Sequence, residues 1–485
     1  MSPTSRRSFL KGTLAATAVT AWSSQSWSQV AGANSDVRVG VIGFNGQGRT
    51  HLAKLRKIPG VRIVALCDAD HQVLYREKAA AEKLGESVQT CTDVHELLAN
   101  PDIDAVTTAT PNHWHALITI WACQAGKDVY VEKPVSHNVW EGRQMVNAAR
   151  KYGRIVQTGT QSRSSKAIAQ AIGFLRSGQL GRPLLARGLC YKRRQTLGRV
   201  NGAQPIPISV NYDLWCGPAP KSSLKRYRLH YDWHWFWETG NGDLGNQGIH
   251  QMDIARWALG YNYLPPRVAS LGGRFGYVDD GQTPNTQLAM YYYQPAPILF
   301  EVRGLPASRS ATEMPTYAGT EIGVIIHCEG GHLQILANEA FAYDSTGKLL
   351  QHFAATNDHK QDHFANFIQS VRDHKPETLH AEILEGHLSS SLCHLGNISY
   401  RLGHTEERGE IQEKLSDEPA TRETFARMVE HLGANEINPA AEPALVGPWL
   451  KFDADREQFL NHSRANALLT RDYRRPFEVP KVNWL

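Results

Sequence analysis

The 485-residue sequence lacks several features that would define other classes of protein. It has only seven cysteines, an odd number, and no two of them are spaced as Cys-x-x-Cys. This argues against a disulfide framework and against a cysteine-based metal site. No uninterrupted apolar run reaches the roughly 18 residues that a membrane-spanning helix needs. We therefore expect buried free thiols, no catalytic metal and no membrane span.

An excess of one charge is also missing. The chain has 52 Lys and Arg against 47 Asp and Glu, and three of the basic residues, Arg6, Arg7 and Lys11, precede the first acid, Asp36. Without these three the balance is 49 to 47. A nearly neutral body argues against nucleic acid as a partner, because phosphate binding needs a concentrated basic surface. With about 150 residues per domain, the length predicts two or three domains.

The N-terminus has the order of an export signal. The charged segment Ser5–Lys11 is followed by a moderately apolar stretch over 12–22 and then by small residues at Ala31–Ala33. A charged start, a short apolar middle and a small-x-small exit are typical of a secretory signal. Because the paired arginines are followed by Phe-Leu-Lys, we expect a twin-arginine signal peptide over 1–33. The export machinery of that pathway would then deliver the folded protein to the periplasm or the cell exterior.

A dinucleotide-binding pattern begins directly after this segment. The β-branched run Val37–Ile42 predicts a strand, a glycine turn follows over 43–48, and a second apolar run over 61–67 ends at an acid, Asp68. Strand, glycine turn, helix, strand and acid is the order of a Rossmann unit. The turn is expected to contact the cofactor phosphates through Gly43, Asn45, Gly46 and Gly48.

Two residues of this pattern bear on the identity of the cofactor. Asn45 occupies the usual second glycine position of the turn, and asparagine tolerates left-handed backbone angles better than most residues. Asp68 lies 20 residues after Gly48, as expected for a carboxylate that binds ribose hydroxyls. Because that carboxylate would repel a 2′-phosphate, the sequence favours NAD, with NADP left possible.

The alternation of strands and helices continues. Strands are expected over 103–108 and 128–131, and a helix opens after Pro111. Such alternation predicts an α/β fold with a doubly wound parallel sheet, whose ligands collect at the carboxyl ends of the strands. The residues expected near the cofactor at these ends are Thr110, Asn112, His115 and Glu132.

Four motifs in order carry a family resemblance. They are the glycine turn, Ala-Thr-Pro-Asn-His-Trp-His at 109–115, Glu-Lys-Pro at 132–134, and Gly-Asp-Leu-Gly-Asn-Gln-Gly-Ile-His-Gln-Met-Asp at 242–253. Over residues 37–405 the chain resembles the Gfo/Idh/MocA oxidoreductases. The resemblance implies an N-terminal Rossmann domain and a C-terminal α/β domain with a large, open, mostly antiparallel sheet. It also implies a homo-oligomer, often assembled through that sheet, and a small carbohydrate or polyol substrate.

The resemblance also implies the active-site residues. The lysine of the Glu-Lys-Pro motif and the histidine of the last motif are Lys133 and His250, and we expect both to act on the substrate proton. Many dehydrogenases of the family carry Asp four residues before that histidine, where this chain has Asn246. An amide cannot take a proton, so Asn246 is expected only to bind substrate. Gln161 and Arg163 are expected to bind substrate as well.

Other segments complete the expected organisation. We expect the nucleotide domain over 34–157, the substrate-binding and oligomerisation domain over 158–405, and a C-terminal extension packed on the body over 406–485. The aromatic stretch 227–238 suits either stacking on sugar rings or core packing. The basic run 191–194 suits either a solvated face or contact with an anionic substrate.

Three functions remain open from the sequence. The first is an NAD(P)-dependent oxidoreductase acting on a CH–OH group of a sugar or polyol, with a tightly held cofactor. The second is an NAD-dependent glycosidase that works by oxidation, elimination and re-reduction. The third is a non-catalytic sugar-binding protein of the same fold.

Overall fold

The computed structural model describes residues 36–415, 418–438 and 441–483. The expected signal peptide therefore lies outside the described residues. No helix within them is long and apolar enough to cross a membrane. All seven cysteines lie within them and are free, and six of the seven are buried, which confirms the expectation of buried thiols.

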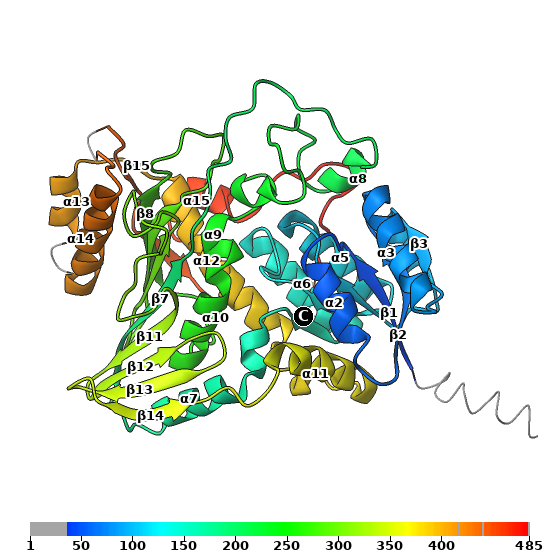
Figure 1. Ribbon diagram of the computed structural model, residues 1–485, viewed down its shortest axis with the longest axis horizontal. Coiled ribbons are helices and arrows are strands. Elements are labelled where there is room, and N and C mark those ends of the chain that lie inside the picture. The colour runs from blue at the N-terminus through cyan, green and yellow to red at the C-terminus, as the bar shows by residue number, and fades with distance from the viewer. Residues whose placement is uncertain (1–35, 416–417, 439–440, 484–485) are drawn as a thin grey trace, which may run out of the picture.

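The N-terminal half folds around a six-stranded parallel sheet, drawn in blue and cyan in Figure 1. Apolar, β-branched runs form its central strands, and two of them, β4 (Ala105–Thr108) and β5 (Asp128–Val131), are buried along their whole length, as expected for strands covered on both faces. The strand order is β3 (Gln89–Cys91), β2 (Val61–Cys67), β1 (Val37–Ile42), β4 (Ala105–Thr108), β5 (Asp128–Val131) and β6 (Val156–Thr158). The connecting helices are α2 (Gln47–Leu55), α3 (His71–Lys83), α4 (Val94–Leu98), α5 (Asn112–Gln124) and α6 (Val139–Tyr152).

The second half contains a 12-stranded mixed sheet. Only the β7–β10 pair is parallel, and the other strand pairs of this sheet are antiparallel. The main strand order is β14 (Leu349–Phe353), β13 (Ala340–Asp344), β12 (Gly331–Ile335), β11 (Ile322–Cys328), β7 (Pro183–Tyr191), β10 (Ile298–Arg303), β9 (Thr286–Tyr292), β8 (Arg267–Gly273), β16 (Leu445–Val446) and β15 (His404–Thr405). Off this path, β17 (Leu450–Asp453) pairs with β8 and with β18 (Gln458–Phe459). The expected large, mostly antiparallel sheet is confirmed.

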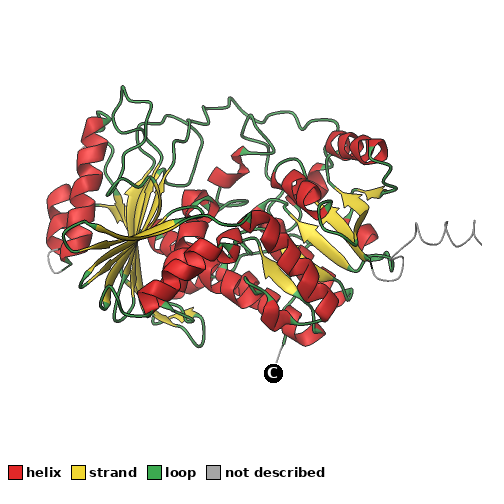
Figure 2. Ribbon diagram, turned by 60° about the horizontal axis from the view of Figure 1, so that its bottom comes forward, coloured by secondary structure: helices red, strands yellow, loops and turns green. Residues whose placement is uncertain are grey.

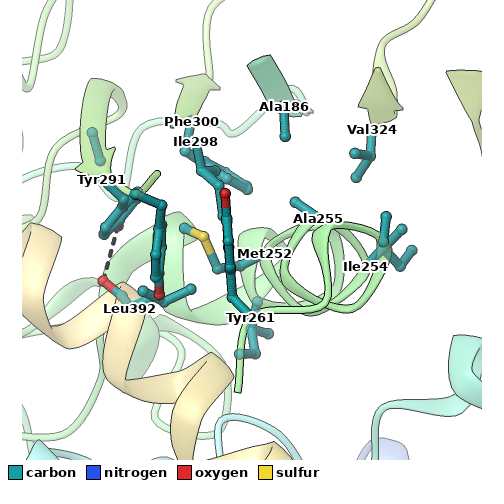
Figure 3. Packing of buried hydrophobic residues seen from close by; sticks show 14 of the residues in the cluster. Ala186, Met252, Ile254, Ala255, Tyr261, Tyr291, Ile298, Phe300, Val324 and Leu392 are labelled. Atoms are coloured by element: carbon teal, nitrogen blue, oxygen red, sulfur yellow. Dashed lines mark hydrogen bonds between the residues drawn. The ribbon is translucent and has the colours of Figure 1, made fainter. Parts of the chain in front are cut away.

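One face of this sheet is covered by helices that lie between the two sheets (Figure 2). They are α7 (Lys166–Arg176), α9 (Gly242–Asn246), α10 (Gly248–Leu259) and α12 (Ile383–Arg401). Met252 of α10 lies against Phe300 of β10, and Tyr291 donates a hydrogen bond to the main-chain oxygen of Leu392, 2.9 Å away (Figure 3). Gly248 lets α10 approach the sheet, because a Cβ there would lie 3.0 Å from the Phe300 ring.

Two segments from later in the chain pack on the nucleotide half. Helix α11 (His359–Asp373) packs on the nucleotide half, where Phe364 stacks on Tyr130 with ring centroids 4.4 Å apart. The end of the chain also returns there, and Phe477 and Val479 join the core under α5 and α6. The core of the nucleotide half is therefore completed by residues more than 200 positions further along the chain.

The C-terminal segment covers part of the outer face of the large sheet. Phe425 and Met428 of α14 (Pro419–Ala434) pack on Leu288 and Leu299 from β9 and β10. Helix α13 (Arg408–Lys414) lies beside α14 (Figure 1). The short elements are α8 (Tyr212–Cys216), α15 (Ser463–Ala467) and the 3-10 turns η1 (Gln161–Ser164), η2 (Asp232–Trp235) and η3 (Pro376–Thr378).

Candidate active site

A cavity of about 710 Å³ lies at the carboxyl ends of the parallel strands, where loops of the second half close over it. Both expected catalytic side chains line it, as do most of the expected ligands. The lining includes Gly43, Asn45, Gly46, Asp68, Thr110, Asn112, His115, Glu132, Lys133, Gln161, Asn246 and His250. The structure thus brings together residues from β1 to α10 that are more than 200 positions apart.

The glycine turn is shaped by close backbone contacts. Gly43 has φ +72°, and a Cβ there would lie 3.0 Å from the Cα of Thr110. Gly48 does not line the cavity, but a Cβ at this position would lie 2.1 Å from the Gly43 oxygen, so only glycine lets α2 begin so close to β1. No side chain caps the start of α2, which leaves its first amides to a ligand.

Asp68 ends β2 at the cavity wall. Its carboxylate accepts hydrogen bonds from the Phe44 amide at 3.1 Å and the Asp70 amide at 3.0 Å. Burial raises its pKa above the ordinary value, while these two amides oppose the shift. Asn45 turns its side-chain oxygen to Arg76, 3.2 Å away. An open helix start preceded by glycines, with a carboxylate 20 residues further on, fits the phosphates and ribose of NAD.

Glu132 is the buried anchor of the cavity floor. Four donors surround its carboxylate: the Lys133 amide at 3.2 Å and the side chains of Gln47 at 3.2 Å, His51 at 3.2 Å and Gln161 at 3.1 Å. Burial alone would raise the pKa of Glu132, but the His51 contact and the nearby positive charges outweigh it and lower the pKa to about 2. Glu132 is therefore a fixed negative charge next to Lys133.

Lys133 and His250 face the cavity from opposite halves of the chain. The Lys133 ammonium donates to the main-chain oxygen of Asn246, 3.0 Å away. Burial lowers the pKa of Lys133, the charge of Glu132 opposes that shift, and the charges of Lys192 and Arg194 add to it. Burial, followed by the charge of Lys133, lowers the pKa of His250 to about 3, so its imidazole is neutral at physiological pH.

The basic run 191–194 points its charges at the last motif. Arg194 makes a bidentate ion pair with Asp243, with nitrogen–oxygen distances of 2.7 and 2.6 Å. Lys192 donates to the side-chain oxygen of Gln247, 2.8 Å away. Lys192 and Arg194 are therefore bound within the protein and contribute positive potential beside Lys133, whereas Arg193 is exposed to solvent.

Arg163 is not among the cavity-lining residues. Its guanidinium is 2.8 Å from Asp253 and 2.9 Å from Glu385, and its side chain is only 7% exposed. Because both partners hold it inside the second half, we withdraw the expectation that Arg163 binds substrate. Gln161 lines the cavity, but its amide donates to Glu132 and Tyr130. His115 lines the cavity with both ring nitrogens against the main-chain oxygens of Pro134 and Thr110.

The aromatic stretch 227–238 contains residues for both of its expected roles, core packing and contact with a sugar ring. Trp235 is buried away from the cavity, whereas Trp233, which is also buried, and Tyr231, which is 41% exposed, line the cavity with His234. His230 lines it too and contacts Asp70 at 2.9 Å.

The sequence did not single out the residues at the start of α11 that reach the same cavity, His359 and Lys360. No local motif marks them, since only the packing of α11 on the nucleotide half brings them there. Within the described residues, no group of three or more His, Cys, Asp or Glu is placed to hold a metal.

Comparison with known proteins agrees with this architecture. Residues 37–160 match the oxidoreductase family model with an NAD-binding Rossmann fold, and residues 170–273 match the model of that family's C-terminal α/β domain. Residues 3–21 match the twin-arginine translocation signal.

Curated relatives include inositol 2-dehydrogenase of Salmonella typhimurium, 31% identical over 157 residues, which are 32% of this chain and 46% of that protein. The enzyme of the same name from Burkholderia cenocepacia is 26% identical over 48% of this chain and 57% of that protein. The chain thus spans about half the length of these relatives.

Solved structures share the fold. Myo-inositol dehydrogenase from Lactobacillus casei, in complex with NAD(H) and myo-inositol, superposes with a TM-score of 0.53 at 19% identity, covering 76% of this chain and 95% of that one. The WlbA dehydrogenase of Bordetella pertussis, with NADH and UDP-GlcNAcA, gives 0.54 at 19% identity, covering 74% and 93%. The chain thus matches both domain models of the Gfo/Idh/MocA oxidoreductase family, and its N-terminal segment matches the twin-arginine signal sequence.

Proposed function

We propose that the chain is an NAD-dependent oxidoreductase acting on a CH–OH group of a sugar or polyol. The observation that carries the proposal is one shared cavity, which is lined by the glycine turn, Asp68, Lys133 and His250. The names of the relatives, inositol 2-dehydrogenase and myo-inositol dehydrogenase, support a polyhydroxylated substrate.

The nucleotide end of the cavity would hold the cofactor. The amides at the start of α2 suit the pyrophosphate, and Asp68 suits the ribose hydroxyls while disfavouring a 2′-phosphate. Bound NAD supplies the hydride acceptor for oxidation of a carbinol. Thr110, which lies against Gly43 of the turn, and Asn112 also line the cavity.

Lys133 and His250 would handle the hydroxyl proton. The Lys133 ammonium, fixed by Asn246, can hold the substrate oxygen and stabilise negative charge on it. A neutral imidazole accepts a proton at one nitrogen and releases one at the other, so His250 passes the proton on without storing it. The lowered pKa of Lys133 also leaves a larger fraction of this side chain as neutral amine, the form that can accept that proton, than an exposed lysine would have.

The cofactor should be retained tightly and recycled in place. An export signal would send the protein to a compartment where free NAD is scarce, so a weakly held cofactor would be lost by mass action. We expect protein purified from the periplasm without added nucleotide to release one NAD(H) per chain on denaturation. Analysis of the released nucleotide checks this, and a panel of polyols, sugars and aryl glycosides then identifies the substrate. Empty protein that oxidises a polyol only with added NAD would refute retention, and failure with every compound would refute the oxidoreductase proposal.

Export should depend on the paired arginines. Replacing Arg6 and Arg7 by lysine preserves charge but removes the pair that the pathway reads, so precursor should accumulate in the cytoplasm. Fractionation followed by immunoblotting measures this. Substituting Lys11 by Arg serves as the matched control and should leave export intact. Equal periplasmic yield from the Arg6→Lys, Arg7→Lys double variant would show that another route exports the chain.

A further inference from the structure

A second cavity of about 520 Å³ lies between the two halves of the molecule, and none of its lining residues lines the first. It is bounded by the segment that follows the Glu-Lys-Pro motif, by α12, and by residues 467–472 of the C-terminal segment. Among the residues lining it, His394, Asn397 and Asn241 are only 3%, 4% and 5% exposed. The cavity is therefore lined by buried polar side chains on its inner side, and it is open to solvent where Glu238, Arg401 and Asp472 lie.

Several nitrogen atoms in its wall are buried without a hydrogen-bond partner among the described residues. They are Nε2 of His137 and the Nε and Nη2 atoms of Arg471. Arg471 is held in place by its Nη1, which donates to the main-chain oxygen of Glu238 at 2.7 Å, and its Nε lies 3.7 Å from Glu141. Guanidinium nitrogens can only donate, so the N–H groups of Arg471 that lack a partner would be satisfied by the oxygen atoms of a bound ligand.

A second guanidinium faces the same space. Arg401, at the end of α12, lies over the Trp237 ring at 5.2 Å and forms no ion pair with a described residue. The carboxylates that line the cavity, Glu238 and Asp472, are exposed at its edge. Arg401 is exposed as well, so the buried nitrogen atoms without a partner in this wall are those of Arg471 and His137.

The electrostatics of the interior agree with this arrangement. Burial lowers the pKa of His137 well below its ordinary value, and the charges of Arg471 and Arg401 lower it further, as does the proximity of His113 and His394. Glu141, the nearest buried carboxylate, already accepts bonds from the His137 amide, the Asn138 side chain and the Tyr473 hydroxyl. Glu141 therefore offsets the charge of Arg471 while most of its acceptor capacity is used, and the charge of Arg401 has no ion-pair partner among the described residues.

We propose that this second cavity binds a small anion through carboxylate or phosphate oxygens, held by Arg401, Arg471 and His137. A guanidinium group binds two oxygen atoms of a carboxylate or phosphate in a planar, bidentate manner. Two guanidinium groups therefore suit a ligand that carries such oxygen atoms. Asn241 joins the two cavities, because it accepts a hydrogen bond from Asn112 at 2.8 Å and donates to the main-chain oxygen of His137 at 3.0 Å. The site is independent of the activity proposed above.

Calorimetric titration of the full mature chain with inorganic phosphate and, separately, with malonate tests the proposal. We expect one saturable site per chain for at least one of these anions, and the stronger of the two identifies the ligand chemistry. Arg401→Gln should weaken binding at least about tenfold, since a charge-assisted contact is removed. The Arg401 side chain makes no hydrogen bond to a described residue and only lies over the Trp237 ring, so this variant should fold like the wild type. Arg464→Gln, on the exposed side of α15, is the matched control and should bind normally.

A second variant separates this site from the nucleotide turn. Arg471→Lys retains a positive charge near Glu141 but loses the planar donors, so it should also weaken anion binding. An anion seated at the start of α2 would bind equally to wild type, Arg401→Gln and Arg471→Lys. That result, or the absence of saturable binding by both anions, would overturn the proposal.

Discussion

Replacing Lys133 by alanine is expected to lower kcat/KM for carbinol oxidation by at least about 10²-fold, the usual scale for a group that acts on a transferred proton. The same loss is expected for His250→Ala. Both side chains line the cavity but belong to neither the glycine turn nor the Asp68 carboxylate, which are proposed to hold the cofactor, so NAD affinity should change little. Steady-state kinetics with separate measurement of NAD binding checks both expectations. Lys225→Ala, an exposed lysine outside the cavity, is the matched control.

The pH dependence adds a readout that a merely structural role would not move. If Lys133 takes part in proton transfer, kcat/KM rises with pH through its pKa, which burial and the charges of Lys192 and Arg194 hold below the ordinary value. Removing one of those charges in Lys192→Met should raise the pKa of Lys133 and move the rising limb to higher pH. An unchanged limb in Lys192→Met, or wild-type rates in Lys133→Ala, would remove Lys133 from the mechanism.

The nucleotide half could be predicted because its signals are local. All the signals lie within 32 residues of sequence. A strand is indicated by Val37–Ile42, a tight turn by the glycines that follow it, and a ribose-binding carboxylate by Asp68. The close contact of Gly48 with the Gly43 oxygen explains why a glycine stands at a position that does not itself face the cavity.

The roles of polar residues in the second half were harder to predict from the sequence, because these residues bind partners that are distant in sequence. Arg163 satisfies the pattern of a substrate ligand, yet Asp253 and Glu385 hold it, and they lie 90 and 222 positions away. Asn246 lines the cavity, so its contact with substrate stays a prediction, but its main-chain oxygen also accepts a hydrogen bond from Lys133. A main-chain role leaves no trace in residue type, so no sequence pattern could have indicated it.

The C-terminal segment shows the same limit at a larger scale. Its aromatic residues indicate packing, but not where. Phe425 covers the outer face of the large sheet, whereas Phe477 enters the core of the nucleotide half. The family resemblance implied an oligomer interface on the open sheet, and α14 covers part of that face within this chain. A homo-oligomer stays a prediction, and its interface would have to accommodate this helix.

The largest effect on stability is expected from acid, because several histidines are buried in neutral form. His113 is fully buried with its ring against the main-chain oxygens of Trp215 and Thr239, and burial, with a smaller contribution from Arg471, lowers its pKa to about 3. Burial likewise lowers the pKa of His363 to about 4. Below about pH 6.5 the unfolded chain binds protons at these sites while the folded chain does not.

The direction and size of the change in stability with pH follow from this difference in proton binding between the folded and unfolded chain. The stabilising contribution of each such histidine is fully present above its unfolded pKa. It declines as pH falls from about 6.5 towards the folded pKa, by up to about 1.4 kcal/mol per pH unit. Carboxylates with lowered pKa act in a lower window. Glu132 and Glu457, both with pKa about 2, lose their contribution only as pH falls below about 4.5. Because a domain has only about 5–15 kcal/mol of stability, the histidines alone should bring the protein close to unfolding near pH 4 to 5.

Urea unfolding at several pH values between 4.5 and 7.5 measures this slope. His113→Gln replaces a titrating ring with a neutral amide, so its free energy of unfolding should be lower than that of the wild type at pH 7.5 but should fall less steeply with acid, by about 1.4 kcal/mol per pH unit. His404→Gln, at a side chain that is 72% exposed, is the matched control for loss of a histidine. If His113→Gln and wild type keep parallel pH profiles, protonation of His113 is not coupled to unfolding, and its low pKa must be abandoned.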